Sequence, residues 1–425
     1  MLKRRTDRRT FLRGSVAAGM AGLTAPGLTA LSYGRVLGAN DRIAVGLIGC
    51  GHRGRYLVEH GIKASGDNAA VTAACDIHKS RLEEYAGVAG KMFGARPSLY
   101  ADHRRLLAEA DVDAVIIATP DHQHCGMGID AVQAGRHAYI EKPLPGLACD
   151  LPDLNRLYDA VKASRVAVQV GTQGVSSPGA AAIRKVIEEK RLGRLFRVES
   201  TETLRAPYWV GYTGPETEAD TDWKAFLYNR PERPFDPVMH AKWMGYIELT
   251  SGTIGGWMSH FVTLVHFVTG CKAPVSAVAW GGRYAPTADP RCTAPDQTAV
   301  LLDYEEGFHT QFTSHFGSDI DNEKTVFMFE KGCIRCRFGH SPGNPVLSTE
   351  GVADDPGAEP LLESEPPHPL TAHVKNWLDC ARSGAQPAAN MELSHKHGIA
   401  VVLGDLAWTL NRKVYYDPAG RAVHA

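Results

Sequence analysis

The chain has 425 residues, with 46 Lys plus Arg against 47 Asp plus Glu and a formal net charge of −1. A near-neutral chain has no positive field for holding phosphate backbones, which excludes a dedicated nucleic-acid binder. No apolar run reaches the roughly 18 uninterrupted residues of a membrane span, and nine cysteines are too few for a disulfide-built scaffold.

The start of the chain has the pattern of an export signal. Residues 1–13 hold six Lys or Arg and one Asp, and the weakly apolar residues 14–31 follow. Residues 7–13 (DRRTFLR) resemble the twin-arginine signal. We expect residues 1–39 to be read by the twin-arginine export machinery and the mature protein to be periplasmic or otherwise extracytoplasmic. An uncleaved basic tail is the alternative. Because twin-arginine export carries folded proteins, the signal favours a cofactor inserted before export.

A glycine-rich turn follows the first apolar run after this segment. Residues 42–48 (RIAVGLI) are typical of a strand buried on both faces of a parallel sheet. Residues 49–54 (GCGHRG) match the dinucleotide-binding motif G-x-G-x-x-G. In that motif Gly49 permits the tight turn, Gly51 lets the backbone approach a pyrophosphate, and Gly54 lets the next helix pack on the strand.

An acidic residue ends the second expected strand. Residues 70–75 (AVTAAC) lead into Asp76, which lies 22 residues after Gly54. A carboxylate at this place accepts hydrogen bonds from the adenosine ribose and repels a 2′-phosphate, which favours NAD over NADP. His78 and Lys79 follow at once and could hold a 2′-phosphate, so NADP(H) stays an alternative.

Strands and helices continue to alternate along the chain. Further strands are expected at residues 112–118, 137–140 and 166–170, with helices at 126–135 and 151–164. This alternation predicts a doubly wound parallel sheet, the Rossmann arrangement. We assign it to residues 40–171 and a second domain to residues 172–425.

Two strand ends carry further motifs. One is T-P-x-x-x-H, with Thr119, Pro120 and His124, and the other is E-K-P, with Glu141 and Lys142. Together with the glycine turn they resemble the Gfo/Idh/MocA family of oxidoreductases, most strongly in the first domain. The resemblance implies an α/β protein whose N-terminal Rossmann domain precedes a C-terminal α/β domain with a large, mostly antiparallel open sheet. It also implies a homo-oligomer.

The resemblance assigns a bound NAD(H) and a catalytic lysine. The implied cofactor-binding residues are Gly49, Gly51, His52, Arg53, Gly54, Asp76, Thr119, Pro120, His124 and Glu141. Lys142 is the implied catalytic residue, because an ammonium beside the nicotinamide can bind a sugar hydroxyl and favour its alkoxide as hydride leaves.

A second catalytic candidate comes from the later domain. The glycine-rich turn at residues 252–256 leads into a helix, and His260 aligns with a family histidine that exchanges a proton with the substrate. Many members carry an aspartate four residues before this histidine, where this chain has Gly256, or three residues after it, where it has Thr263. The usual constellation therefore lacks its carboxylate, and a plain buried histidine is the alternative.

Aromatic and polar residues between these motifs could contact a sugar. Trp209, His240 and Trp243 are candidates, because sugar faces stack on aromatic rings while polar groups bind hydroxyls. Core packing explains such residues equally well. The lone C-x-x-C of Cys333 and Cys336 has no second pair at a suitable spacing, so we predict no metal site. Residues 341–369 are expected to form a surface loop.

The predicted function is an NAD(P)-dependent oxidoreductase that acts on a sugar or sugar derivative with a tightly bound cofactor. Outside the cytoplasmic membrane there is no free NAD(H) pool, so the cofactor must be restored in place. A redox-neutral glycoside hydrolase, working by oxidation, elimination, water addition and re-reduction, also meets this condition, as in the NAD-dependent N-acetylgalactosaminidases of the family. A non-catalytic nucleotide-binding sensor is the third alternative.

Overall fold

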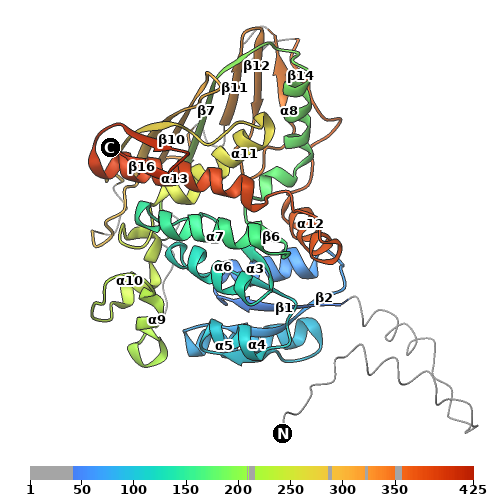
Figure 1. Cartoon of the computed structure of the whole chain (residues 1–425), viewed down its shortest axis with the longest axis vertical. Coiled ribbons are helices and arrows are strands. Elements are labelled where there is room, and N and C mark those ends of the chain that lie inside the picture. Colours follow the sequence, from blue (N-terminus) through green and yellow to red (C-terminus); the bar gives the residue numbers. More distant parts are fainter. Residues whose placement is uncertain (1–41, 208, 210–215, 286–289, 321–323, 350–356) are drawn as a thin grey trace, which may run out of the picture. The chain divides into compact units, whose positions relative to one another are not determined.

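Six short parallel strands form the first sheet of the computed structural model (Figure 1). The structure describes residues 42–207, 209, 216–285, 290–320, 324–349 and 357–425. The expected export signal, residues 1–39, lies outside them. None of the described helices is long and apolar enough to cross a membrane.

The strand order of this sheet is β3-β2-β1-β4-β5-β6, and every pair is parallel. The strands are β1 (Ile43–Ile48), β2 (Ala69–Cys75), β3 (Ser98–Tyr100), β4 (Ala114–Ile117), β5 (His137–Ile140) and β6 (Val168–Val170). All four residues of β4 are buried, as apolar strands covered on both faces require. The order confirms the predicted Rossmann sheet. The short β3 was not predicted, because its three residues carry no apolar run.

Helices connect these strands on both sides of the sheet. They are α3 (His52–Leu57) with the π-helix η1 (Val58–Lys63), α4 (Lys79–Phe93), α5 (His103–Glu109), α6 (His124–Gln133) and α7 (Leu151–Ala163). Local capping fixes the ends of α4: the His78 ring accepts from the Arg81 amide, and Gly94 closes the helix in the left-handed conformation with φ of 78°.

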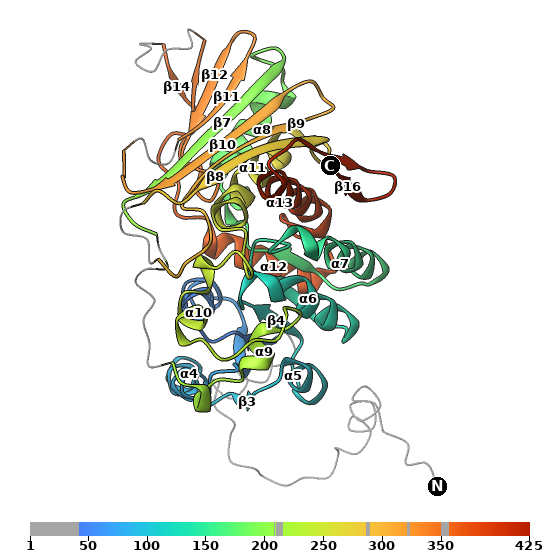
Figure 2. The ribbon, with the colours of Figure 1, turned by 90° about the vertical axis from the view of Figure 1, so that its left-hand side faces the viewer.

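The second sheet has ten strands in the order β14-β13-β12-β11-β7-β10-β9-β8-β15-β16 (Figure 2). They are β7 (Leu195–Leu204), β8 (Ser276–Gly282), β9 (Gln297–Asp303), β10 (His309–Phe316), β11 (Lys324–Phe329), β12 (Gly332–Cys336), β13 (Val346–Ser348), β14 (Glu359–Pro360), β15 (Val414–Asp417) and β16 (Ala422–His424). Only β7 and β10 pair in parallel, which confirms the mostly antiparallel sheet. The strands β13 and β14 lie inside residues 341–369, so the prediction of a loop throughout that stretch was wrong.

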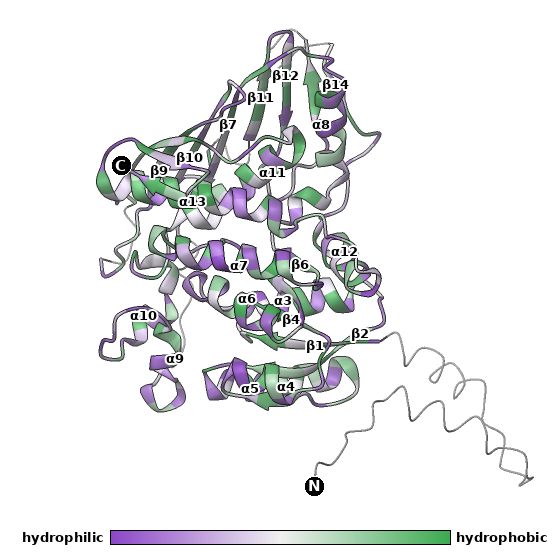
Figure 3. Cartoon of the chain, in the orientation of Figure 1, coloured by the Kyte–Doolittle hydropathy of each residue, from purple (hydrophilic) through white to green (hydrophobic). Residues whose placement is uncertain are grey.

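Three helices cover one face of the second sheet and join it to the Rossmann domain. These are α8 (Pro178–Glu188), α11 (Ser259–Thr269) and α13 (Met391–Leu410). Much of α13 is green in Figure 3, because its middle carries the apolar run Ile399–Leu403. One hydrophobic cluster runs from Ile117 of β4 through Leu403 of α13 to Phe312 of β10. The helix α12 (Leu370–Ser383) instead packs Trp377 into the cluster around β1.

The segment after β7 lies beside the Rossmann domain, as both ribbon views show for its helices α9 (Trp223–Leu227) and α10 (Pro237–Ala241). Polar contacts are part of its attachment to that domain. The Phe226 carbonyl lies 2.8 Å from the Nε2 of His122, and Arg230 makes a buried two-point ion pair with Asp150 at 2.7 Å. These bonds set the position of one wall of the site described below.

Candidate functional site

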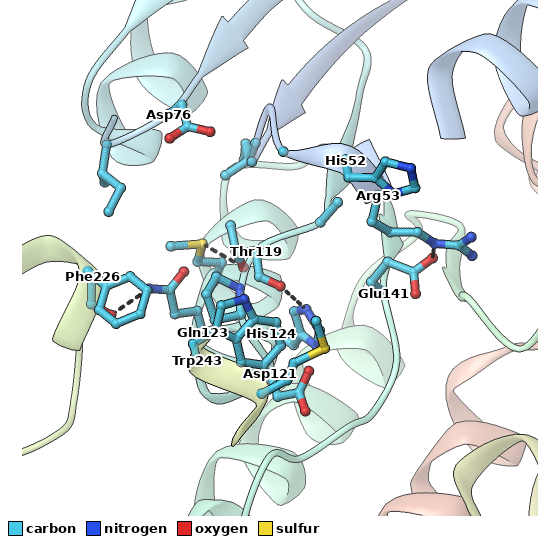
Figure 4. Close-up of a pocket in the computed structure, with 18 of the residues that line it drawn as sticks. His52, Arg53, Asp76, Thr119, Asp121, Gln123, His124, Glu141, Phe226 and Trp243 are labelled. Atoms are coloured by element: carbon cyan, nitrogen blue, oxygen red, sulfur yellow. Dashed lines mark hydrogen bonds and ion pairs between the residues drawn. The ribbon is translucent and has the colours of Figure 1, made fainter. Parts of the chain in front are cut away.

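A cavity of about 900 Å³ lies at the carboxyl ends of the parallel strands, and residues between Glu216 and His260 line its other side. Ligands of open α/β sheets bind at this edge, and the volume is in the range of cofactor sites. Figure 4 shows its first-domain wall, with Asp76 at one end and the pair of Arg53 and Glu141 at the other.

The glycine turn between β1 and α3 has the shape that a dinucleotide requires. Gly49 has a φ of 91°, and a Cβ there would meet the Ala118 carbonyl oxygen at 2.5 Å. A Cβ on Gly54 would lie 2.1 Å from the Gly49 carbonyl oxygen, so only glycine lets α3 pack this closely. Gly51 borders the cavity and a Cβ there would meet nothing within 4 Å. That open space beside the helix N-terminus fits a pyrophosphate.

Asp76 braces this turn from the end of β2. Asp76 is buried, and its carboxylate accepts hydrogen bonds from the backbone amides of Cys50 at 2.7 Å and His78 at 2.8 Å. Each carboxylate oxygen has a further lone pair, which leaves acceptor capacity toward the cavity. The position and chemistry of Asp76 therefore fit the ribose contact that the sequence predicts.

One histidine ties the two later strand-end turns together. The His124 ring lies within hydrogen-bonding distance of two carbonyl oxygens, 2.8 Å from that of Thr119 and 3.0 Å from that of Pro143 (Figure 4). The T-P turn and the E-K-P turn thus hold each other in place. Thr119, Pro120 and His124 all line the cavity.

Glu141 and Arg53 form an ion pair on the same wall. The Arg53 Nε donates to the Glu141 carboxylate at 2.8 Å, and Glu141 is 4% exposed. Burial of Arg53 is offset by this carboxylate, which raises the guanidinium pKa. Both residues line the cavity, as does His52.

The two candidate catalytic residues lie at this end. Lys142 is partly buried, and its ammonium donates to the backbone carbonyl of Gly256 at 2.8 Å. Burial lowers the lysine pKa, while the carboxylates of Glu141 and Asp121 oppose the change. Gly256 belongs to a π-helix, η8 (Ile254–Met258), that runs directly into α11. Its carbonyl oxygen thus contacts Lys142 where the sequence lacks a carboxylate.

His260 is on α11 and lines the same cavity, 8% exposed. Burial holds its pKa well below 6.5, and the charges of Lys142 and His340 lower it further. The imidazole is therefore neutral near pH 7. Among the described residues its Nδ1 has no hydrogen-bond partner.

Three residues at this end were not predicted as site residues. Asp121 is buried between the two motif turns, accepts a hydrogen bond from Thr250 at 2.8 Å, and has a pKa raised by burial. Asp121 directly follows Thr119 and Pro120 of the predicted cofactor motif, so its position in the sequence already indicated a place in the site. His340 and His368 also line the cavity, with the ring centroids of His260 and His340 5.9 Å apart. His340 directly precedes the stretch expected to be a loop and His368 lies within it, so only the tertiary fold brings them here.

The candidate sugar contacts separate into two groups. His240 and Trp243 line the cavity, and Trp243 is labelled in Figure 4. Trp209 is not among the lining residues: it is 2% exposed and packs edge-on against Phe316, with ring centroids 5.1 Å apart. Of the described residues, no group of His, Cys, Asp or Glu is arranged to hold a metal ion. Cys333 and Cys336 are both buried.

Comparisons with known proteins agree with this geometry. Residues 43–172 match the family model of the Gfo/Idh/MocA oxidoreductase family, NAD-binding Rossmann fold. A relative from Shewanella sp. strain ANA-3, "Glycosyl hydrolase family 109 protein 2", is 35% identical over 165 residues, which cover 35% of this chain and 36% of that protein. "Levoglucosan dehydrogenase" of Pseudarthrobacter phenanthrenivorans is 28% identical over 196 residues, covering 46% of this chain and 42% of that protein. The chain thus spans less than half the length of these relatives.

A solved structure extends the likeness in fold beyond the first domain. The WlbA dehydrogenase from Bordetella pertussis, crystallised with NADH and UDP-GlcNAcA, superposes with a TM-score of 0.64 at 19% identity. The superposition covers 88% of this chain and 99% of the dehydrogenase. Residues 43–172 of this chain therefore match the NAD-binding Rossmann domain of the Gfo/Idh/MocA oxidoreductase family, and the described chain shares the fold of a solved dehydrogenase.

Proposed function

We propose that the chain is a sugar oxidoreductase that keeps its NAD(H) bound through repeated turnovers. The observation that carries the proposal is that Lys142 and His260 line the same cavity as the cofactor motif. The sugar class is supported by the relative named levoglucosan dehydrogenase and by the aromatic and imidazole groups of the cavity wall, which suit hydroxyl-rich rings.

Lys142 and His260 have different roles in the proposed reaction. Bound NAD⁺ would accept the hydride from the reacting carbon. The Lys142 ammonium donates one N–H to the Gly256 carbonyl, so its other two N–H groups can donate to the substrate oxygen. Its positive charge stabilises the developing alkoxide in a buried site. The neutral imidazole of His260 takes the hydroxyl proton, which a protonated ring could not do.

The export signal is what makes a permanently held cofactor part of the proposal. A protein outside the cytoplasm meets no pool of free NAD(H), so each reduced cofactor must be oxidised again in place. Oxidation of one sugar coupled to reduction of a second carbonyl compound meets this condition, and we take it as the proposed reaction.

A redox-neutral glycoside hydrolase is the second candidate, favoured by the relatives named glycosyl hydrolase family 109 protein. In that reaction transient oxidation of a sugar hydroxyl acidifies the neighbouring C–H bond. Elimination of the aglycone, addition of water and re-reduction then return the cofactor to its starting state. The same two residues would serve, with Lys142 at the oxidised oxygen and His260 moving the proton.

Assays with each kind of substrate alone distinguish the oxidoreductase reaction from glycoside hydrolysis. The purified chain receives either aryl glycosides or free sugars with a carbonyl acceptor, without added nucleotide. Release of the aryl alcohol with no acceptor present supports hydrolysis. Sugar oxidation that depends on the acceptor supports the oxidoreductase, and an absence of both reactions over a broad sugar panel contradicts the proposal.

A further inference from the structure

The adenosine end of the cavity is closed by a segment from beyond the Rossmann domain. We call residues 216–222 the clasp. Thr221 forms an isolated antiparallel bridge with His78, and the Asp222 amide donates to the Ile77 carbonyl at 3.1 Å. The clasp therefore lies against the residues that directly follow β2, where a Rossmann domain receives the adenosine ribose.

The clasp brings a second carboxylate to this end of the cavity. Glu216 and Asp76 both line the cavity, and their side chains are 7% and 4% exposed. Arg81 lies between them, with Nη2 3.3 Å from Oε1 of Glu216 and Nη1 3.7 Å from Oδ1 of Asp76. Two buried carboxylates against one guanidinium leave a net negative charge at the ribose position.

Lys79 and His78, the other basic side chains that follow β2, also contact the clasp. The Lys79 ammonium donates to the Ala219 carbonyl at 2.9 Å. The His78 ring lies between two carboxylates, 3.2 Å from Glu216 on its Nε2 side and 3.2 Å from Asp220 on its Nδ1 side. His78 and Lys79 are the residues for which the sequence analysis kept NADP(H) as an alternative cofactor. In the folded chain both have partners other than a phosphate.

We propose that Glu216 is a specificity-determining residue, which acts with Asp76 to make the cofactor site accept NAD and reject NADP. A 2′-phosphate would bring up to two negative charges against the two carboxylates. It would also have to displace Glu216 from Arg81, since the Glu216 carboxylate already contacts Arg81 at 3.3 Å and the ring nitrogen of His240 at 2.6 Å. This inference rests on the NAD-binding site and not on the proposed sugar reaction.

The test measures which nucleotide the full chain holds. Wild type, Glu216→Gln, Glu216→Asp and Glu218→Gln are each stripped of bound nucleotide and incubated with equal concentrations of NAD and NADP. Free nucleotide is then removed, the protein is denatured, and both dinucleotides are quantified. Glu218 is an exposed carboxylate of the same clasp and serves as the matched control. A thermal melt of each variant confirms that it is folded.

We expect wild type, Glu216→Asp and Glu218→Gln to hold NAD in large excess. Glu216→Gln should raise the bound NADP to NAD ratio roughly tenfold or more, because the charge is lost and Arg81 becomes available to a phosphate. A folded Glu216→Gln variant with the wild-type ratio, or a wild-type chain that prefers NADP or binds neither nucleotide, would overturn the inference. The ratio is measured without turnover, so a chain inactive on sugars but selective for NAD contradicts only the proposed reaction.

Discussion

Lys142 and Gly256 show how a missing side chain can be replaced by the backbone. Many family members place a carboxylate at the position of Gly256, and this chain places only a carbonyl oxygen there, 2.8 Å from the Lys142 ammonium. A carbonyl orients the ammonium but leaves it with a net positive charge. The lysine is therefore free to stabilise a substrate oxyanion, and its own pKa is lowered by burial.

Lys142→Ala tests this residue directly. Loss of the ammonium should reduce the turnover number by about 10²–10⁴-fold, the range for an acid–base or oxyanion-stabilising group. The cofactor should stay bound, because the glycine turn and Asp76 do not involve the lysine. Turnover is measured beside the dinucleotide released on denaturation. A variant with wild-type turnover would remove Lys142 from the mechanism.

The pH profile of turnover tests the two protonation states together. The reaction needs neutral His260, whose pKa is held well below 6.5 mainly by burial, so activity should fall only far on the acid side. The reaction also needs a protonated Lys142. Because burial lowers the pKa of this lysine from 10.5, the loss of activity at alkaline pH should have its midpoint below pH 10.5. In His260→Ala the residual rate should lose the acid limb. An acid limb unchanged in that variant would assign it to another group.

At the scale of elements, two glycines of the same turn have different roles, Gly51 in cofactor binding and Gly54 in folding. Gly51→Ala adds a methyl to open space, so its free energy of unfolding should stay within about 1 kcal/mol of wild type. The same methyl would occupy the pyrophosphate position, and the NAD affinity should fall roughly tenfold or more. Gly54→Ala places its Cβ against the Gly49 carbonyl and should instead cost at least ~2 kcal/mol of stability.

Chemical denaturation and nucleotide titration of the two variants give the comparison. Gly87→Ala is the control, because a Cβ on this glycine of α4 also meets nothing within 4 Å and the residue does not line the cavity. It should bind NAD as the wild type does, and its free energy of unfolding should be equal to or up to about 1 kcal/mol above that of the wild type, because alanine favours a helix interior over glycine. NAD affinity at the wild-type level in Gly51→Ala would mean that the pyrophosphate does not lie on this turn.

At the scale of the whole molecule, the exposed face of the second sheet predicts self-association, as the family resemblance also does. Val278, Trp280 and Leu301 are 42%, 51% and 44% exposed, and the pairing of Val278 with Leu301 places them on one face. Large apolar groups on one sheet face are typical of an interface. Light scattering should show a homo-oligomer that Trp280→Glu dissociates, and a monomeric wild type would contradict this.

The sequence predicted the parts of the site that local pattern controls. Gly49, Thr119 and Lys142 each follow an apolar strand, and parallel strands bring their carboxyl ends to one edge, so the first-domain wall was predictable. Glu216 and His340 were not, because they reach the cavity only through contacts between distant segments. Trp209 could not be distinguished from a cavity residue, since an aromatic side chain suits a core and a sugar site equally.

The content of bound nucleotide in the purified chain tests the central claim most directly. The chain is dialysed extensively without nucleotide and denatured, and the supernatant is assayed for nicotinamide dinucleotides. The account predicts about one NAD(H) per chain, retained through dialysis. A folded chain that releases none, and that works on sugars only with NAD supplied from solution, would contradict a permanently held cofactor.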